Sequence, residues 1–307
     1  MGVYDRYGNA LTVETARQEI FARSVAHRGY NYGTGTQLNN TDGAPENTLP
    51  AYRLAKKKGF LYAECDVAFT SDGVAVLLHD STIDRTSNGT GSLASLTFEQ
   101  VRQYDFGYYN GSTHITGYEG YDPNSIVQIP TFEEFIECCK EIGLRPYVEM
   151  KADTVYTQAQ IESLVDIVEE YGMLDETTWI SFGSTSSNSG RGLTYLTYVK
   201  NYKPTARLGY LTFAVVSADA TRAITLRSGQ NEVFMDARGT LANSMYIPTS
   251  TEIGYCSAQN LPLETWGQCN SDTKACILAT PTYIGGFTTN KWVADEVYVE
   301  ALRESLI

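Results

Sequence analysis

A repeated alternation of short apolar strands and amphipathic helices runs through the chain and limits the folds that it can adopt. Eight segments have the length and composition of buried strands: Ser24–Arg28, Tyr62–Val67, Arg145–Met150, Trp179–Phe182, Arg207–Leu211, Val233–Asp236, Leu263–Gly267 and Tyr283–Thr288. Helices are predicted near residues 49–59, 96–104, 131–143, 158–171, 193–202, 219–227, 251–259 and 290–304. This α/β series predicts one closed parallel sheet with helices outside it, a (β/α)8 or TIM barrel, rather than two domains.

The length of 307 residues suits a single barrel of this kind. We predict that residues 24–307 form this domain and that residues 1–23 are an N-terminal extension packed on the barrel. Two long polar loops, 31–45 and 108–128, are expected at the face where the strands end. Loops of that length are often functional, although plain surface decoration fits both equally. We expect His114, in the second loop, to be solvent-exposed rather than a ligand.

The second predicted strand carries two acidic residues, Glu64 and Asp66, two positions apart. Side chains alternate along a strand, so both carboxylates are expected on one face. The dipeptide Asp72-Gly73 predicts a tight type I′ hairpin after this strand. In that register the return strand Val74–His79 brings its terminal histidine opposite Asp66. Taken alone, the stretch also fits a solvated sheet edge with a structural histidine.

Charged side chains stand at the ends of two other predicted strands. His27 and Arg28 end the first strand, while Glu149 and Lys151 lie on one face at the end of the third. The carboxyl ends of barrel strands are where catalytic residues emerge, so these four are candidate site residues. The alternatives are a surface charge at Arg28 and a simple ion pair between Glu149 and Lys151.

Six motifs in this order resemble those of the glycerophosphodiester phosphodiesterases. They are HRG (27–29), PENT (45–48), ECD (64–66), TSDG (70–73), HD (79–80) followed by DRTSNGTG (84–91), and VEMK (148–151). The resemblance covers residues 24–290, and it depends on the shared order and spacing because no single motif is specific. It implies a (β/α)8 barrel with a β-hairpin after the second strand.

The resemblance also implies a role for each matching residue. His27 and His79 match the acid/base pair, and one divalent cation is expected at Glu64, Asp66 and Glu149. The remaining matches are phosphate contacts at Arg28 and Lys151, polar residues near the metal and phosphate at Glu46 and Asn47, and an apolar pocket wall at Trp266. Carboxylates are hard ligands, so calcium or magnesium is expected and a softer metal is not.

The activity implied by the resemblance is metal-dependent hydrolysis of small glycerophosphodiesters to sn-glycerol 3-phosphate and an alcohol. One alternative substrate is a teichoic-acid-type polyglycerol-phosphate polymer, which the long loops and 22 tyrosines would suit. An alternative of another class is a catalytically silent barrel used as a binding module. Asn290 permits that reading because many relatives have an aspartate after the last strand. Activity on lysophospholipids would require an exposed apolar rim that the sequence does not reveal.

The net charge and the cysteines limit the binding partners and the cellular location that we expect. The net charge of −13 argues against binding nucleic acid or an anionic membrane surface. No stretch is apolar enough for a membrane span or a signal peptide. The six cysteines lack metal-binding spacing and are expected to be free, which favours a cytoplasmic location. A secreted or virion-associated location stays open, and the oligomeric state is unknown.

Overall fold

The computed structural model describes residues 24–34, 37–183, 190–238, 240–242, 245–268 and 284–289. The predicted N-terminal extension at 1–23 and the predicted last helix at 290–304 lie outside these residues. Four cysteines fall within them, and each is a free, buried thiol as expected: Cys65, Cys138, Cys139 and Cys256. No helix in this part of the chain combines the length and apolarity that a membrane span requires.

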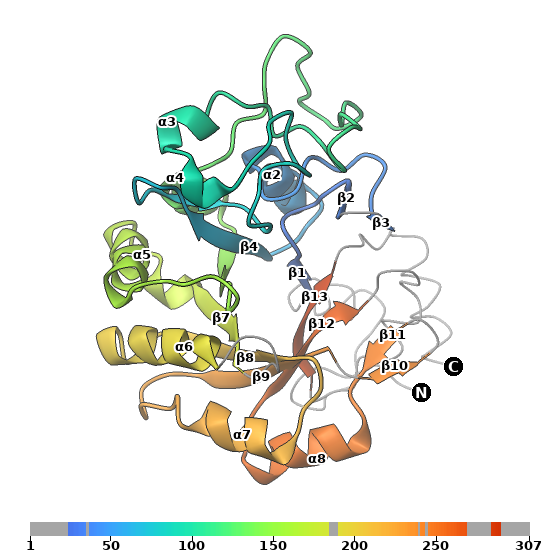
Figure 1. Ribbon diagram of the computed structural model, residues 1–307. Helices are drawn as coiled ribbons and strands as arrows, with labels where there is room; N and C mark the ends of the chain where they lie inside the picture. The colour runs from blue at the N-terminus through green and yellow to red at the C-terminus, as the bar shows by residue number, and fades with distance from the viewer. Residues whose placement is uncertain are drawn as a thin grey trace.

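Eight parallel strands form the central sheet (Figure 1). They are β1 (Ser24–Ala26), β4 (Tyr62–Phe69), β6 (Arg145–Met150), β7 (Thr178–Phe182), β8 (Arg207–Thr212), β9 (Val233–Ala237), β12 (Leu263–Gln268) and β13 (Ile284–Thr289). Strand β1 pairs with β13 on one side and with β4 on the other, so the ring is closed. This closure confirms the predicted (β/α)8 barrel.

Helices cover the outside of the sheet, with α5, α6 and α7 following one another around it (Figure 1). The helices described are α2 (Leu49–Lys57), α3 (Phe98–Val101), α4 (Phe132–Ile142), α5 (Gln158–Glu170), α6 (Arg191–Tyr202), α7 (Ser217–Ile224) and α8 (Ser250–Ala258). Thr131 caps α4 through a reciprocal capping box with Glu134, and Gly143 ends it in the left-handed conformation. Short antiparallel pairs form at β2 (Gly33–Thr34) with β3 (Gln37–Leu38) and at β10 (Thr240–Ala242) with β11 (Met245–Ile247).

Alternation along the strands separates two apolar regions. On the outer face Cys65 and Val67 pack in one large core with Tyr52 of α2 and Phe135 of α4. Inside the barrel a smaller cluster joins five side chains of five different strands: Val25, Tyr147, Ile180, Leu211 and Phe234. These side chains form the apolar part of the barrel interior.

The hairpin after β4 has a different turn from the predicted one. Strand β5 (Ala75–Leu77) pairs with β4 so that Val67 faces Leu77. Thr70 bonds to Val74 across a three-residue loop in which Gly73 has a φ of 83°. The type I′ prediction was wrong because the chain uses a three-residue loop with a left-handed glycine, the next commonest hairpin. This loop shifts the pairing by one residue.

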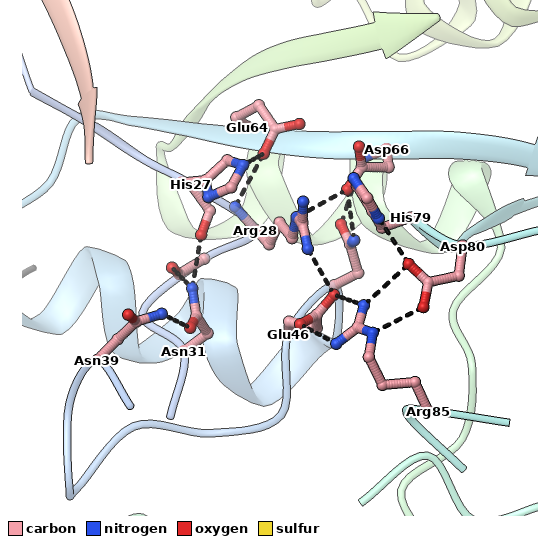
Figure 2. A network of polar contacts seen from close by, with 12 residues as sticks. His27, Arg28, Asn31, Asn39, Glu46, Glu64, Asp66, His79, Asp80 and Arg85 are labelled. Atoms are coloured by element: carbon pink, nitrogen blue, oxygen red, sulfur yellow. Dashed lines mark hydrogen bonds and ion pairs between the residues drawn. The ribbon is translucent and has the colours of Figure 1, made fainter. Parts of the chain in front are cut away.

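The shifted register changes the neighbour of Asp66. Leu78 lies opposite it and donates its backbone N–H to the Asp66 carbonyl at 3.0 Å. The predicted pairing of His79 with Asp66 was therefore also wrong. Since β5 ends at Leu77, strand alternation does not govern the direction of His79. The irregular backbone after β5 carries this side chain back toward the acidic residues (Figure 2).

Candidate active site

Three carboxylates meet between the middle of β4 and the carboxyl end of β6. Glu64 and Asp66 lie on β4, and Glu149 of β6 is the direct partner of Asp66 in the parallel register. One oxygen of each lies within 4.8 Å of the other two, and all three residues are buried. Parallel pairing thus gathers acids that are distant in the sequence at a single point.

This cluster has the chemistry of a hard cation site. Burial together with repulsion from Asp66 and Glu149 raises the pKa of Glu64 well above its ordinary value. Glu64 Oε1 is buried and accepts no hydrogen bond from any residue that the structure describes. A buried acceptor without a donor is costly, and a divalent cation is the ligand that three carboxylates suit. The three residues therefore fit the expected metal.

Two cationic side chains border the acids. Lys151 Nζ lies 3.2 Å from Asp66 Oδ1 and 3.1 Å from Glu149 Oε1. Arg28 Nε lies 3.1 Å from Asp66 Oδ2. Burial disfavours the charge of Asp66, but Lys151 and Arg28 outweigh burial and hold the pKa of this carboxyl well below its usual range. The site therefore keeps Asp66 ionised and presents two positive groups beside it.

Asn47 fixes the orientation of Asp66 from the start of α2. Its Nδ2 donates to Asp66 Oδ2 at 2.9 Å, and its Oδ1 accepts from the hydroxyl of Tyr52 at 2.9 Å. The backbone of Asn47 has a φ of 54°, a left-handed conformation that asparagine tolerates better than most residues. The predicted polar residue Asn47 thus contacts a candidate metal ligand directly.

His27 follows the end of β1 and lies beside Glu64. Its Nε2 is 3.9 Å from Glu64 Oε2, and the next backbone N–H, that of Arg28, donates to the same oxygen at 2.9 Å. The sharp turn here needs Gly29 at a φ of 79°, because a side chain at this position would lie 2.8 Å from Ala51. The turn directs both His27 and Arg28 at the acids of β4.

His79 belongs to a chain of ionic contacts on the other side of the acids (Figure 2). Its Nδ1 lies 2.6 Å from Asp80 Oδ1, and Arg85 Nε donates to Asp80 Oδ2 at 2.6 Å. Arg85 also donates to both oxygens of Glu46, at 2.7 and 2.8 Å, and Glu46 accepts from Arg28 Nη1 at 2.9 Å. Burial opposes the charge of Glu46, but Arg28 and Arg85 lower its pKa.

This chain of contacts adds to the sequence prediction. Glu46 was expected near the metal and phosphate, and its carboxylate is bound by Arg85 and by Arg28, which also contacts Asp66. Asp80 and Arg85 received no role, although both stand in quoted motifs, at positions 80 and 85. Their signal was present in the residue types, since an aspartate directly after a candidate catalytic histidine is a common orienting partner.

An aromatic group occupies the ends of the strands across the barrel. Trp266 of β12 has its ring centroid 5.4 Å from that of Phe182 and 5.4 Å from that of Phe213. Its Nε1 donates to the Thr212 carbonyl at 3.0 Å, and the Arg238 guanidinium lies 5.5 Å from its ring. Trp266 was expected to form an apolar wall. The sequence did not predict Phe182 and Phe213 as neighbours of Trp266, because neither belongs to one of the motifs.

His114 is not the solvent-exposed residue that was expected. Its Nε2 lies 2.9 Å from Asp105 Oδ2, and the ring packs edge-on against Tyr108 and Tyr121. Asp105 also accepts the backbone N–H groups of Gly107 and Val127. These bonds join the two ends of the long loop, so His114 has a structural role there.

Comparisons show which known proteins this chain resembles. A model of the "Glycerophosphoryl diester phosphodiesterase family" matches residues 27–282. The chain is 37% identical over 155 residues to glycerophosphodiester phosphodiesterase 1 of Mus musculus, covering 50% of this chain and 41% of that protein. It is 29% identical over 187 residues to a glycerophosphodiester phosphodiesterase of Caldanaerobacter subterraneus, covering 61% and 65%. The match therefore spans less than half of the mouse relative and about two thirds of the bacterial one.

Solved structures share the fold. An Oleispira antarctica phosphodiesterase in complex with the product sn-glycerol-3-phosphate matches with a TM-score of 0.64 and 19% identity, over 95% of this chain and 98% of that one. A glycerophosphodiester phosphodiesterase of Agrobacterium tumefaciens matches with a TM-score of 0.60 and 19% identity, over 91% and 99%. At this level of identity the likeness supports the barrel alone.

Proposed function

The chain belongs to the glycerophosphoryl diester phosphodiesterase family, and on that premise we propose that it hydrolyses glycerophosphodiesters to sn-glycerol 3-phosphate and an alcohol. The observation that carries the proposal is the meeting of three buried carboxylates with Arg28, Lys151 and two histidines at one end of the barrel. Hydrolysis of a phosphodiester needs both positive charge and proton transfer. The anionic substrate repels nucleophiles, and its alkoxide is a poor leaving group.

Substrate binding is assigned to Arg28 and Lys151. Arg28 is buried and Lys151 is partly buried; this burial disfavours their charge, but neighbouring acids raise the pKa of each. Both side chains are therefore positive at neutral pH. They offset the charge of the phosphate and stabilise the additional charge that develops in the transition state.

The metal would be held by Glu64, Asp66 and Glu149. When bound, a divalent cation supplies Lewis-acid polarisation of a phosphoryl oxygen and offsets its charge. Calcium and magnesium both prefer carboxylate oxygen, so we propose one of these two ions. Without it, the three acids of the cluster repel one another, in agreement with the raised pKa of Glu64.

Proton transfer is assigned to His27 and His79. They approach the acidic cluster from different segments, His27 beside Glu64 and His79 beside Asp80. One ring would remove a proton from the attacking oxygen and the other would protonate the leaving alcohol, as imidazole does near neutral pH. Imidazole acts as a base when neutral and as an acid when protonated, so each ring suits both roles.

The test is release of choline or ethanolamine from the corresponding glycerophosphodiester by the purified chain, with and without a chelator. We expect turnover that a chelator abolishes and that added Ca²⁺ or Mg²⁺ restores. Turnover that ignores the chelator would contradict the metal assignment, and no turnover with either ion would contradict the activity.

The binding-module alternative is not favoured, because Glu64, Asp66, Glu149, His27 and His79 are all present around one point. The polymer alternative differs only in the length of the substrate. Its test is the size of the products from a polyglycerol phosphate, compared with the rate on a small diester.

A further inference from the structure

We propose that Asp80, clamped by Arg85, is a positioning residue that fixes the tautomer and direction of the His79 ring. The proposal concerns the same site and rests on the proposed function of His79 in proton transfer. It depends on a chain of contacts that runs from His79 through Asp80, Arg85 and Glu46 to Arg28 (Figure 2).

The contact between His79 and Asp80 determines where the ring carries its proton. Nδ1 lies 2.6 Å from Asp80 Oδ1. An ionised carboxylate only accepts hydrogen bonds, so Nδ1 must be the donor in this contact. In the neutral ring Nε2 then has the lone pair, and it is the nitrogen that exchanges a proton with the substrate.

Asp80 is kept ionised by its neighbours. Burial disfavours its charge, but the hydrogen bond to His79 and the contacts with Arg85 outweigh burial and hold the pKa of the carboxyl far below its ordinary value. Arg85 donates to both carboxylate oxygens, to Oδ2 at 2.6 Å and to Oδ1 at 3.2 Å. Arg85 thus binds Oδ2 and shares Oδ1 with the imidazole.

Arg85 is itself fixed by Glu46. The guanidinium donates through Nη1 to Glu46 Oε2 at 2.8 Å and through Nη2 to Oε1 at 2.7 Å, while its Nε is used by Asp80. A planar guanidinium can serve two carboxylates at once, whereas an ammonium group cannot match both with this geometry. Glu46 continues the chain to Arg28. The ring that transfers protons and the arginine assigned to the phosphate therefore share one rigid support.

Because Arg85 fixes the orientation of the side chain at position 80, Asp80→Asn should change the tautomer of His79 in a defined way. The side-chain oxygen of asparagine is required by Arg85 Nε, which makes the shorter of the two contacts with Asp80. The amide NH₂ then takes the place of Oδ1 and can only donate, so the longer contact with Arg85 Nη2 is lost and the neutral His79 ring is expected to move its proton to Nε2. The variant keeps the shape of the Asp80 side chain, but the lone pair of the His79 ring lies on Nδ1 instead of Nε2.

The protein provides an internal reference for this experiment. It has three histidines, so the nitrogen signals can be assigned with single variants. His114 contacts Asp105 through Nε2 rather than Nδ1, at 2.9 Å. In one long-range ¹H–¹⁵N spectrum at alkaline pH, His79 should be protonated on Nδ1 and His114 on Nε2. In Asp80→Asn, we expect only His79 to change its tautomer.

Kinetics on a glycerophosphodiester give the second readout. Asp80→Asn should lower kcat by about 10- to 100-fold with KM changed less than about threefold, as for other partners that orient a functional group. Arg85→Lys, which keeps the charge and loses the fork, should give a smaller loss in the same direction. The matched control is Arg102→Lys, because Arg102 makes the same two-pronged contact with Glu134 away from the site, at 2.7 and 2.8 Å.

The outcomes separate this inference from the proposed function. An active wild type in which His79 is protonated on Nε2, or an Asp80→Asn variant with wild-type kcat and tautomer, would overturn the positioning role. An inactive wild type with the expected tautomers would instead contradict the phosphodiesterase activity. If Asp80→Asn fails to fold, Arg85→Lys decides, since an unchanged kcat in that folded variant contradicts the clamp.

Discussion

Asp66 and Glu149 are direct partners on neighbouring parallel strands, β4 and β6, and Lys151 bridges their carboxylates with contacts of 3.2 and 3.1 Å. Two ionised carboxylates at paired positions of neighbouring strands repel each other strongly when they are buried. The ammonium group and Arg28 compensate part of this charge, and Glu64 adds a third carboxylate without a donor for its Oε1 among the described residues. The arrangement is one that a divalent cation would complete.

Replacement of Glu64 separates charge repulsion from metal binding. In metal-free protein, Glu64→Gln should raise Tm, because it removes one of three mutually repelling acids and its amide oxygen can still accept the Arg28 backbone N–H. With millimolar Ca²⁺ the wild type should gain in Tm and the variant should not. Thermal melts with and without the ion check both expectations. A variant that is stabilised by Ca²⁺ as much as the wild type would remove Glu64 from the metal site.

Loss of either histidine should impair turnover and leave metal binding intact. His27→Ala and His79→Ala should each reduce kcat by on the order of 10²-fold or more, since each removes a group that transfers a proton. Calorimetric titration with Ca²⁺ should give affinities close to that of the wild type. The control is His114→Gln, in the loop held by Asp105, which should keep its rate. A near-normal rate in one of the alanine variants would exclude that histidine from the mechanism.

Trp266 is expected to act in binding. Its ring contacts Phe182 and Phe213 and forms the aromatic side of the barrel mouth. Trp266→Ala should raise KM by about tenfold, which corresponds to roughly 1.4 kcal/mol, with a smaller change in kcat. Trp266→Phe retains an aromatic face, so its KM should lie between that of the wild type and that of Trp266→Ala. Initial rates over a range of diester concentrations measure this, and equal KM values in all three proteins would contradict the assignment.

The capping box of α4 predicts a pH dependence of stability. Burial disfavours the charge of Glu134, but Arg102 and the Thr131 backbone N–H lower its pKa below the ordinary value. A depressed pKa in the folded state stabilises the protein above the unfolded-state pKa and loses this effect as the pH falls through the folded-state pKa. Glu134→Gln should therefore cost about 0.5 kcal/mol at pH 7 and less near pH 3.

The control for Glu134→Gln is the neighbouring Glu133→Gln, on the same first turn of α4 but without an arginine partner in the described structure. Urea unfolding of both variants at the two pH values provides the measurement. A Glu134→Gln penalty that does not change with pH would contradict the ionic contribution of Glu134.

The barrel could be predicted because the alternation of strands and helices is a local pattern. Strand and helix periodicity placed Glu64 and Asp66 on one face of a strand, and the motif series assigned Glu149 to the same site, where the register of β4 and β6 has it. The prediction of the hairpin turn failed because Asp72-Gly73 fits more than one type of turn. One additional residue in the loop changes every cross-strand neighbour.

Contacts between distant loops were not visible in the sequence. Arg85 and Glu46 stand on different loops, and nothing in their own segments shows that they meet. Their pairing is set by how the chain after β5 folds back over the start of α2. For the same reason Phe182 and Phe213 could not be assigned to Trp266, because Phe182 ends β7 and Phe213 follows β8.

The central claim is that Glu64, Asp66 and Glu149 hold one divalent cation beside His27 and His79. A crystal soaked in Mn²⁺, a stand-in with anomalous scattering, tests it most directly. The account predicts one strong anomalous peak within about 2.0–2.6 Å of an oxygen of each of the three carboxylates. A peak elsewhere with none at these residues, or no peak at a Mn²⁺ concentration that supports turnover, would contradict it.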